Sequence, residues 1–362
     1  MRQYIATSMM ILILLSGAAF AGEKLPKPDR IPANATSQQK ALISEGVSLD
    51  NVGRYDDAIV KYNQVLEVAP DVIGAIYELG YSYFHKKDYE NALELARRGV
   101  QYKSEVLPHL YVLLGNTLDE MGKRAEATDV YKDAIKRSPE TALLHFNLGL
   151  TLMGDGKLPE AKEEMQKSVA LAPSHASSHY VLATLYHRLQ YRIPALLALT
   201  RFLLIEPDSP RAKDVIPVLE RLIVGNVTAG KDPNHINITL SMTPDSKKDE
   251  GDFDAIELAM SMSIAAGQTK ESKEKSSQFR VLASTYGVMG AIMSNMKKKG
   301  FAAKYYAPFY AEVDKLEYIE ALVNQAFQAA KVDGCAEWRD ENSSKIGDFQ
   351  KWVSGYEWPN TK

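Results

Sequence analysis

Apolar residues recur three or four positions apart along most of the chain beyond residue 36, which is the spacing of helices that bury one face. One such stripe consists of Leu143, Phe146, Leu150 and Met153. Turn-forming glycines separate successive stripes, as at Gly53, Gly122 and Gly156. This succession of amphipathic segments and turns predicts an all-α fold.

The stripes repeat with a fixed period between Pro108 and Pro207 when the sequence is written in rows of 34 residues. Gly115 and Gly149 occupy the same position of successive rows, followed by Ala183. Other positions that recur from row to row hold Ala127, Ala161 and Ala195, and then Pro139, Pro173 and Pro207. A fixed period with small residues and a closing proline is typical of a stacked helical-repeat array.

The rows resemble the tetratricopeptide repeat, whose pattern is a large residue, Leu-Gly, an aromatic, Ala, an aromatic, Ala and Pro. Row three fits best, with Leu114-Gly115, Tyr131 and Pro139 in place, whereas Ser104 replaces the proline of row two. Five rows begin at Gln39, Ile73, Pro108, Ala142 and Ala176. The resemblance covers residues 39–209 and implies a right-handed solenoid of about five helix pairs.

The N-terminal 21 residues are typical of a cleaved signal peptide. Arg2 precedes an apolar core, and Ala19 and Ala21 fit the cleavage site, so the mature chain is expected to start at Gly22. Residues 22–36 contain three prolines and are expected to form a linker, and the array with its capping helix is expected over 37–225. We expect no stable membrane span after cleavage, and a periplasmic or secreted location.

Residues 226–252 are expected to form a linker with one possible short strand at 235–243, where apolar and polar residues alternate. No second strand is evident. Residues 253–358 return to helical spacing, and Asp252 is expected to cap the first helix. A second helix is expected to reach about Lys299, and a third to run from near Pro308 to about Ala330. These helices could be degenerate repeats or a separate domain.

The candidate chemistry is sparse. The net charge of −3 gives no electrostatic reason to expect nucleic acid as a partner. His175, His179 and His187 are the nearest approach to a metal set, but no carboxylate lies in step with them, so no metal and no cofactor are expected. No phosphate-binding loop or nucleophile elbow is present, and we therefore predict no enzymatic activity. Cys335, the single cysteine, cannot form an internal disulfide.

The resemblance implies a concave groove lined by the first helix of each pair. Two asparagines of the family's carboxylate clamp are matched by Asn116 and Asn147, but its cationic positions are not, so the groove is expected to be aromatic and apolar. A hydrophobic peptide or helix suits such a surface. The residues assigned to the groove are Tyr77, Tyr81, Phe84, Val112, Asn116, Phe146, Asn147, Leu150, Met153, Tyr180, Thr184 and His187.

These features favour an exported scaffold that binds a protein or peptide partner in its groove. Two alternatives stay open. An enzyme or small-ligand site could lie in the C-terminal helical region, or the repeats could assemble with copies of themselves into a structural protein. The apolar stripe could also be covered by the chain itself, with the alternating segment 235–243 as the occupant. The sequence leaves the oligomeric state undetermined.

Overall fold

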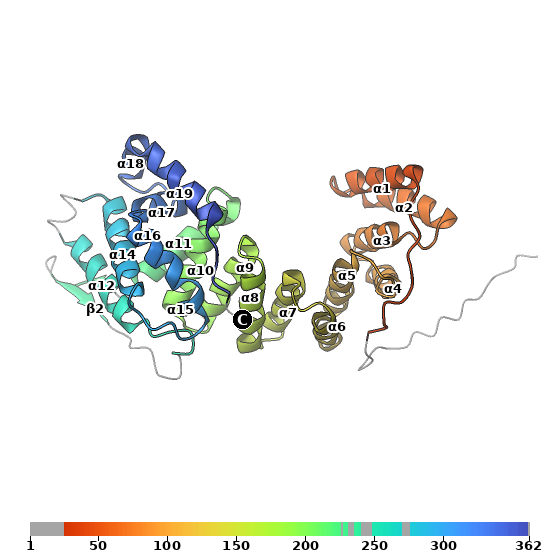
Figure 1. The fold of residues 1–362 in the computed structure, drawn as a ribbon, viewed down its shortest axis with the longest axis horizontal. Coiled ribbons are helices and arrows are strands. Elements are labelled where there is room, and N and C mark those ends of the chain that lie inside the picture. Colours follow the sequence, from red (N-terminus) through yellow and green to blue (C-terminus); the bar gives the residue numbers. More distant parts are fainter. Residues whose placement is uncertain (1–24, 226, 231–234, 240–247, 270–275, 361–362) are drawn as a thin grey trace, which may run out of the picture. The chain divides into compact units, whose positions relative to one another are not determined.

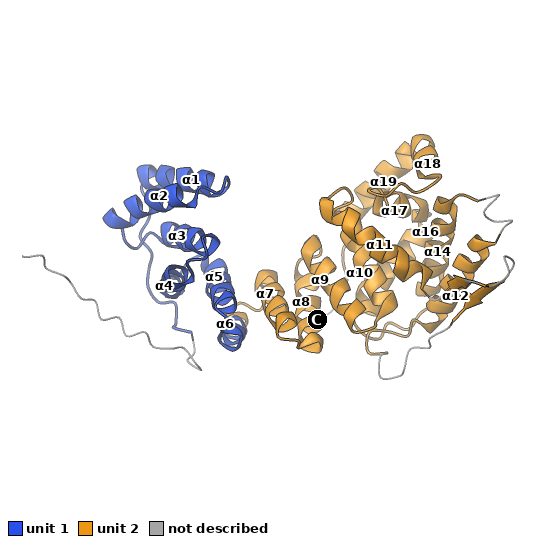
Figure 2. Cartoon of the chain, turned by 180° about the vertical axis from the view of Figure 1, so that it is seen from behind, with its two compact units in different colours: residues 1–133 blue, residues 134–362 orange. Residues whose placement is uncertain are grey.

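The structure is a computed structural model that describes residues 25–225, 227–230, 235–239, 248–269 and 276–360. The chain consists of two compact units, one formed by residues 1–133 and the other by residues 134–362 (Figure 2). The expected signal peptide at residues 1–21 lies outside the described residues.

Helices occupy both units, and the fold is an all-α helical-repeat fold, as predicted (Figure 1). Each of the five rows forms one helix pair. The pairs are α1 (Ser37–Asp50) with α2 (Tyr55–Val68), α3 (Ile73–His85) with α4 (Tyr89–Gly99), α5 (Leu107–Glu120) with α6 (Arg124–Arg137), α7 (Ala142–Gly154) with α8 (Leu158–Leu171), and α9 (Ala176–Arg188) with α10 (Arg192–Ile205).

Local sequence signals set the two ends of the array. Thr36 accepts a hydrogen bond from the backbone of Gln39, whose side chain accepts one from the backbone of Thr36, so a complete capping box opens α1. After the fifth pair, α11 (Pro210–Val224) follows as the expected additional helix. It ends at Gly225, which has a φ of +55° and can adopt this conformation because it lacks a Cβ atom.

The turn inside every pair has the same left-handed residue at the same row position. Glycine supplies it in rows one, three and four, at Gly53, Gly122 and Gly156. In rows two and five, Lys87 and Gln190 adopt it instead, with φ of 62° and 65°. The fold therefore imposes this turn even where the sequence offers no glycine, and a side chain at such a position carries a steric cost.

We expect Lys87→Gly to stabilise residues 1–133 by about 0.5–1 kcal/mol, because glycine relieves that cost but makes the unfolded chain more flexible. Gly122→Ala is the matched reverse change, since an added Cβ would meet no atom within 4 Å and only the backbone is affected. Urea unfolding followed by far-UV circular dichroism measures both. Destabilisation by Lys87→Gly would contradict this explanation of the turn.

The expected strand exists, and it pairs with a second strand that was not evident in the sequence. β2 (Ile236–Ile238) pairs antiparallel with β1 (Val227–Ala229), with Thr228 opposite Asn237. Both strands contact α12 (Asp254–Gln268). β1 was missed because a strand of three residues is too short to show alternation. Residues 240–243 of the expected strand lie outside the described part of the chain.

Three expected boundaries in the C-terminal region need correction. Asp252 is not the cap of α12, since Phe253 holds that position and the Asp252 carboxylate instead bonds Lys248 and the backbone of Asp254. The second helix, α14 (Gln278–Met293), ends before the basic run at Lys297. The further helices of the described part of the chain are α15 (Phe301–Tyr305), α16 (Ala307–Lys315), α17 (Ile319–Ala326), α18 (Cys335–Glu341) and α19 (Ser343–Gly355).

The expected single helix after Pro308 is broken into α16 and α17 by Glu317, which has a φ of 57°. The amide of Glu317 donates to the carbonyl of Asp314, and the amide of Tyr318 donates to that of Val313. The same two bonds close the turn of each repeat, as at Gln190 and Tyr191. The turn geometry of a repeat thus recurs in the C-terminal region without the repeat's glycine, which is why the sequence pattern missed it.

The C-terminal helices pack onto the last two repeats and belong to the same compact unit. Tyrosine hydroxyls make many of the polar contacts: Tyr305 donates to the carbonyl of Val169 in α8, and Tyr310 donates to that of Leu197 in α10. Residues 193–204 of α10 are buried on every side, because α9 and the C-terminal helices enclose them. The alternative of a separate C-terminal domain does not fit this packing.

None of the helices in the described ranges combines the length and apolar character needed to cross a membrane. Cys335 is buried and carries a free thiol, with the amide group of Asn324 3.6 Å from its sulfur.

Candidate functional site

A small pocket in residues 1–133 lies between α3 and α5, the first helices of the second and third repeats. Its volume is about 50 Å³. The wall includes five residues predicted for the groove: Tyr77, Tyr81, Phe84, Val112 and Asn116. His109 and Leu113 complete it. Successive repeats place these side chains together because the same helix face recurs at equivalent row positions.

Aromatic rings extend this pocket into a continuous row. The ring of Tyr77 lies 6.1 Å from that of Tyr81 and 6.0 Å from that of His109. Beyond Tyr81, the ring of His85 follows at 4.3 Å and stacks on Tyr55 at 5.5 Å. We call these five rings the aromatic row. Tyr55 and His85 were not predicted from the sequence, because they lie at the start of α2 and the end of α3, outside the repeat positions assigned to the groove.

The aromatic row combines exposed apolar surface with little charge. Tyr81 is 40% exposed, and no Asp, Glu, Lys or Arg side chain forms part of the pocket wall. Burial, followed by the nearby Glu78 carboxylate, raises the pKa of Tyr77 to about 12, so the phenol stays neutral. Burial and then the charge of Asp50 also raise the pKa of Glu78. Such a surface suits an apolar side chain of a partner.

The side chains of Asn116 and Asn147, which match the family's carboxylate clamp, form hydrogen bonds within the protein. The side-chain oxygen of Asn116 accepts from the hydroxyl of Tyr131 at 2.6 Å, which fixes the second helix of that pair. Asn147 is buried and donates to the carbonyl of Leu143 in its own helix. Asn116 therefore joins the two helices of its pair, whereas the bond of Asn147 lies within α7.

The other predicted groove residues lie in residues 134–362, where their environments differ. Phe146 makes an edge contact with His175 at 5.0 Å, and Tyr180 packs against Phe202 at 5.5 Å. The hydroxyl of Thr184 donates to its own helix, at the carbonyl of Tyr180. Leu150 and Met153 are half-buried, and His187 is exposed at the end of α9. Because the two sets lie in different compact units, they are treated as two surfaces.

The segment 235–243 was considered as a cover for the groove, but its described part packs elsewhere. Ile236–Ile238 pairs with β1 and contacts α12. Contacts of the C-terminal region with the repeats include those made by α8 and α10 and, on α9, by His179 and Tyr186. These two α9 residues occupy row positions other than those assigned to the groove.

Two buried histidines connect successive repeats. His145 and His179 occupy the same row position, and the Nε2 atom of each bonds the carbonyl of the proline that closes the preceding row, Pro139 or Pro173. The Nδ1 atom of His179 bonds the hydroxyl of Tyr306 at 2.8 Å. Burial, followed by the charge of Arg201, lowers the pKa of His179 to about 3, so this ring is neutral.

Hydrogen bonds engage ring nitrogens of His175 and His179, two of the three histidines considered for metal binding. Both ring nitrogens of His179 are engaged, and Nδ1 of His175 bonds the Ser178 hydroxyl at 2.7 Å. Within the described ranges, no group of three or more His, Cys, Asp or Glu side chains is arranged to hold a metal ion.

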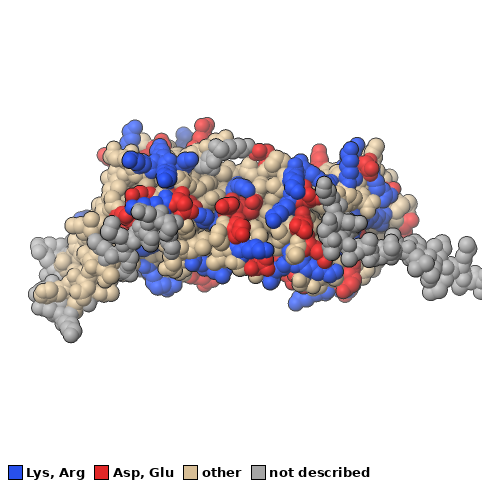
Figure 3. Space-filling model, turned by 90° about the horizontal axis from the view of Figure 1, so that it is seen from below, with Lys and Arg blue, Asp and Glu red and all other residues tan. Residues whose placement is uncertain are grey.

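Charged side chains of both signs are interspersed over the face of the molecule in Figure 3. Within the repeats, charged side chains form short-range pairs, such as Lys167 with Glu164 at 2.8 Å. The pocket and aromatic row of residues 1–133 are therefore distinguished by their ring content and not by a concentration of charge.

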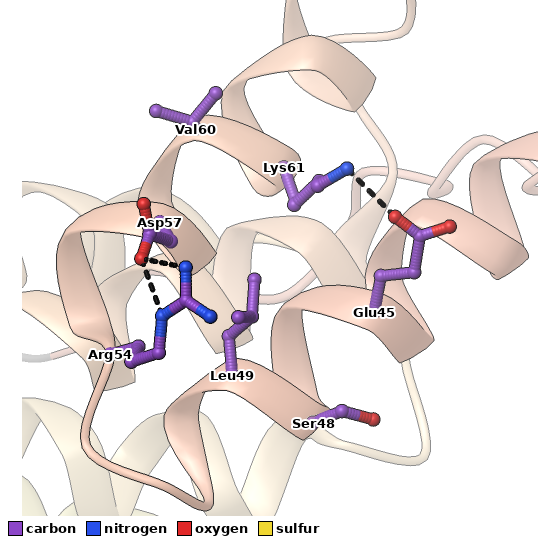
Figure 4. A pocket seen from close by; sticks show the side chains of 7 residues that line it. All are labelled: Glu45, Ser48, Leu49, Arg54, Asp57, Val60 and Lys61. Carbon is purple, nitrogen blue, oxygen red and sulfur yellow. Dashed lines mark hydrogen bonds and ion pairs between the residues drawn. The ribbon is translucent and has the colours of Figure 1, made fainter.

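A second depression lies between α1 and α2 (Figure 4). Its charged side chains bond one another: Arg54 pairs with Asp57 at 2.7 Å, and Lys61 pairs with Glu45 at 2.8 Å. Since these charges are already neutralised by neighbours, the depression offers less to a charged ligand than its composition suggests.

The fold and the pocket define a class, an all-α repeat protein with an aromatic surface on the first helices of its pairs. The sequence profile of the tetratricopeptide repeat matches residues 44–104 and 112–176. Residues 44–104 and 112–176 are therefore tetratricopeptide repeats.

Several known proteins share part of this sequence. A TPR repeat-containing thioredoxin of Arabidopsis thaliana is 40% identical over 75 residues, which are 21% of this chain and 11% of that protein. A protein O-mannosyl-transferase of Mus musculus is 27% identical over 159 residues, which are 40% of this chain and 17% of that protein. The chain therefore spans under a fifth of the length of these curated relatives.

A solved structure of a thermophilic TPR protein from Thermus thermophilus is 22% identical, with a TM-score of 0.43, and covers 51% of this chain and 98% of its own.

Proposed function

We propose that this chain is an exported scaffold that binds an apolar segment of a protein or peptide partner at the aromatic row. The tetratricopeptide fold itself is suited to protein–protein interaction. One observation carries the proposal: the residues that the repeat pattern assigns to the groove in two successive repeats line one pocket, and one of them, Tyr81, is 40% exposed.

The pocket also indicates what the partner presents. A cavity of about 50 Å³ with ring and aliphatic walls admits the end of one apolar side chain, and the neighbouring rings can cover a helix turn beside it. Burial of aromatic area supplies most of the binding free energy in such an interface. Because the wall carries no Asp, Glu, Lys or Arg, binding should depend only weakly on salt. The proposal includes no catalytic step.

We infer export from residues 1–21, and a periplasmic or secreted location for a mature chain that starts at Gly22. Recovery of the tagged chain from the native envelope, followed by mass spectrometry, tests the location, the N-terminus and the partner together. An N-terminus at Met1 in membrane-bound protein would contradict the inferred export. Recovery of only further copies of the chain would favour the self-assembling alternative.

Tyr81→Ala is expected to weaken binding of the recovered partner by about 2 kcal/mol or more, because a central exposed aromatic is the usual hot spot of an interface. Calorimetry on purified components measures the loss. Val68→Ala and Lys132→Ala are matched controls on exposed positions of α2 and α6, and each should change affinity by less than about 0.5 kcal/mol. Equal losses in Tyr81→Ala and the controls would exclude the aromatic row as the binding site.

A further inference from the structure

The guanidinium of Arg201 is a buried charge without an acidic partner. Arg201 lies on α10 and is 6% exposed. Its Nε and Nη1 atoms have no hydrogen-bond acceptor in the described part of the chain. Nη2 reaches the carbonyl of Pro173 at 3.5 Å, the limit of a hydrogen bond, and that carbonyl already accepts from His179.

Aromatic rings compensate for part of the cost of burying this charge. The guanidinium carbon lies 4.8 Å from the centre of the Trp358 ring and 5.9 Å from that of Phe309. Desolvated cation–π contacts contribute about 2 kcal/mol, whereas removing an ion from water costs several kcal/mol. Burial accordingly lowers the pKa of Arg201. The ring contacts alone leave the guanidinium short of both acceptors and negative charge.

A cavity of about 530 Å³ adjoins this group, and Arg201 forms part of its wall. Its volume lies in the range of small-molecule sites. Leu204, Val353 and Trp358 supply apolar wall, and Ser174 and Gln350 supply polar groups. Arg201 is the one ionised side chain among the described residues that line it. Gln325, also in the wall, has a buried side-chain oxygen without a donor.

We propose that this cavity is a binding site for an organic monocarboxylate with an apolar body. The carboxylate would supply the negative charge and the hydrogen-bond acceptors that Arg201 lacks. The electrostatic attraction between the carboxylate and the guanidinium is stronger where the surrounding wall excludes water. The aromatic and aliphatic wall would cover the body of the ligand. One positive charge without a second cation matches a monoanion better than a phosphate ester. The site lies in residues 134–362 and is independent of the aromatic row.

Two sources could supply such a carboxylate: a free small acid, or the C-terminal carboxyl group of a peptide. The volume favours the free acid. The experiment uses the full mature chain and three probes, phenylacetate, its neutral analogue phenylacetamide, and N-acetyl-alanyl-phenylalanine with a free carboxyl group. Thermal unfolding followed by tryptophan fluorescence, and calorimetry, measure binding of each probe.

We expect phenylacetate to raise the melting temperature and phenylacetamide to leave it unchanged. Arg201→Met should weaken phenylacetate binding by about tenfold or more, because it removes a charge-assisted hydrogen bond. Tighter binding of the peptide than of phenylacetate, lost in Arg201→Met, would support the site and identify the peptide source. Equal binding of phenylacetate and phenylacetamide, or unchanged binding in Arg201→Met, would overturn the proposal.

A second variant keeps the test decisive if Arg201→Met does not fold. Val353→Trp fills the cavity from α19 and leaves Arg201 in place. It should abolish phenylacetate binding while the protein retains its fold by circular dichroism. Undiminished binding in Val353→Trp would show that the acid binds elsewhere and would overturn the proposal.

Discussion

Glu250→Ala is expected to lower the unfolding free energy of residues 134–362 by about 3–5 kcal/mol, because it removes the buried one of the two carboxylates that pair with the buried Lys162. Glu250 is 3% exposed, and its carboxylate accepts from Lys162 at 2.6 Å. It also accepts from Gln166 at 2.8 Å, from Tyr186 at 2.9 Å and from the backbone of Ala302 at 3.2 Å. One side chain thus joins two repeat helices to the start of α15.

The cost follows from the burial of Lys162, whose side chain is 9% exposed. Burial lowers the pKa of Lys162, but the hydrogen bonds and charges of Glu250 and Asp249 outweigh burial and raise it. The ammonium group therefore stays charged and needs its acidic partners. Asp249, which is about half exposed and also bonds Tyr191, cannot replace a fully buried carboxylate.

The three tryptophans, Trp338, Trp352 and Trp358, all lie in residues 134–362, so tryptophan fluorescence during urea unfolding reports this unit. Glu320→Ala is the matched control in the same unit. Its partner Lys345 lies 3.4 Å away, and both side chains are about a third exposed or more, so its loss should cost less than about 1 kcal/mol. Equal effects of the two substitutions would show that the Glu250 network does not stabilise the C-terminal packing.

Gly115→Leu is expected to destabilise residues 1–133 by about 2–4 kcal/mol, because overpacking forces the third helix pair apart. A Cβ atom at Gly115 would lie 2.3 Å from the ring of Tyr131, which is fully buried and held by Asn116. A rigid ring fixed at its hydroxyl cannot move aside. Far-UV circular dichroism during urea unfolding measures the loss.

The same change at the equivalent position of the next row should cost less. At Gly149 a Cβ atom would meet the end of the Met165 side chain at 2.9 Å, and methionine adapts its rotamers readily. Gly74→Leu is the control within residues 1–133, since the nearest atom, in Ile43, is 3.9 Å from the added Cβ. If Gly115→Leu were no more costly than Gly74→Leu, the small-residue position would not be a close contact.

The repeat helices were predictable because each row carries its own signals. The period fixed the pairs, Thr36 and Gln39 fixed the first boundary, and Gly53 marked a left-handed turn. The turns at Lys87 and Glu317 were not visible, since tertiary packing imposes them on residues without a preference for them. The single helix predicted from near Pro308 to about Ala330 was wrong because the turn at Glu317 was not visible in the sequence.

The packing of the C-terminal helices could not be derived from spacing. It depends on single hydroxyls that reach backbone carbonyls far along the chain, as from Tyr310 to Leu197. One signal was present: residues 193–204 are apolar almost throughout, which indicates a helix covered on all sides.

The residues predicted to line the groove lie on two separate surfaces, one in each compact unit. Tyr77, Tyr81 and Phe84 of α3 line one pocket with Val112 and Asn116 of α5, because equivalent positions of neighbouring pairs share a face, and their role in binding stays a prediction. Tyr55 and His85 extend the surface through ring contacts that no repeat position specifies. Whether the residues of the two units act together stays a prediction.

The most direct test of the binding surface is site-specific photocrosslinking to the partner. A benzophenone amino acid replaces Tyr81, in the aromatic row, or Val68, which is 81% exposed at the end of α2. Our account predicts a crosslink to the partner from position 81 and none from position 68. A crosslink of equal yield from both positions, or from position 68 alone, would contradict it.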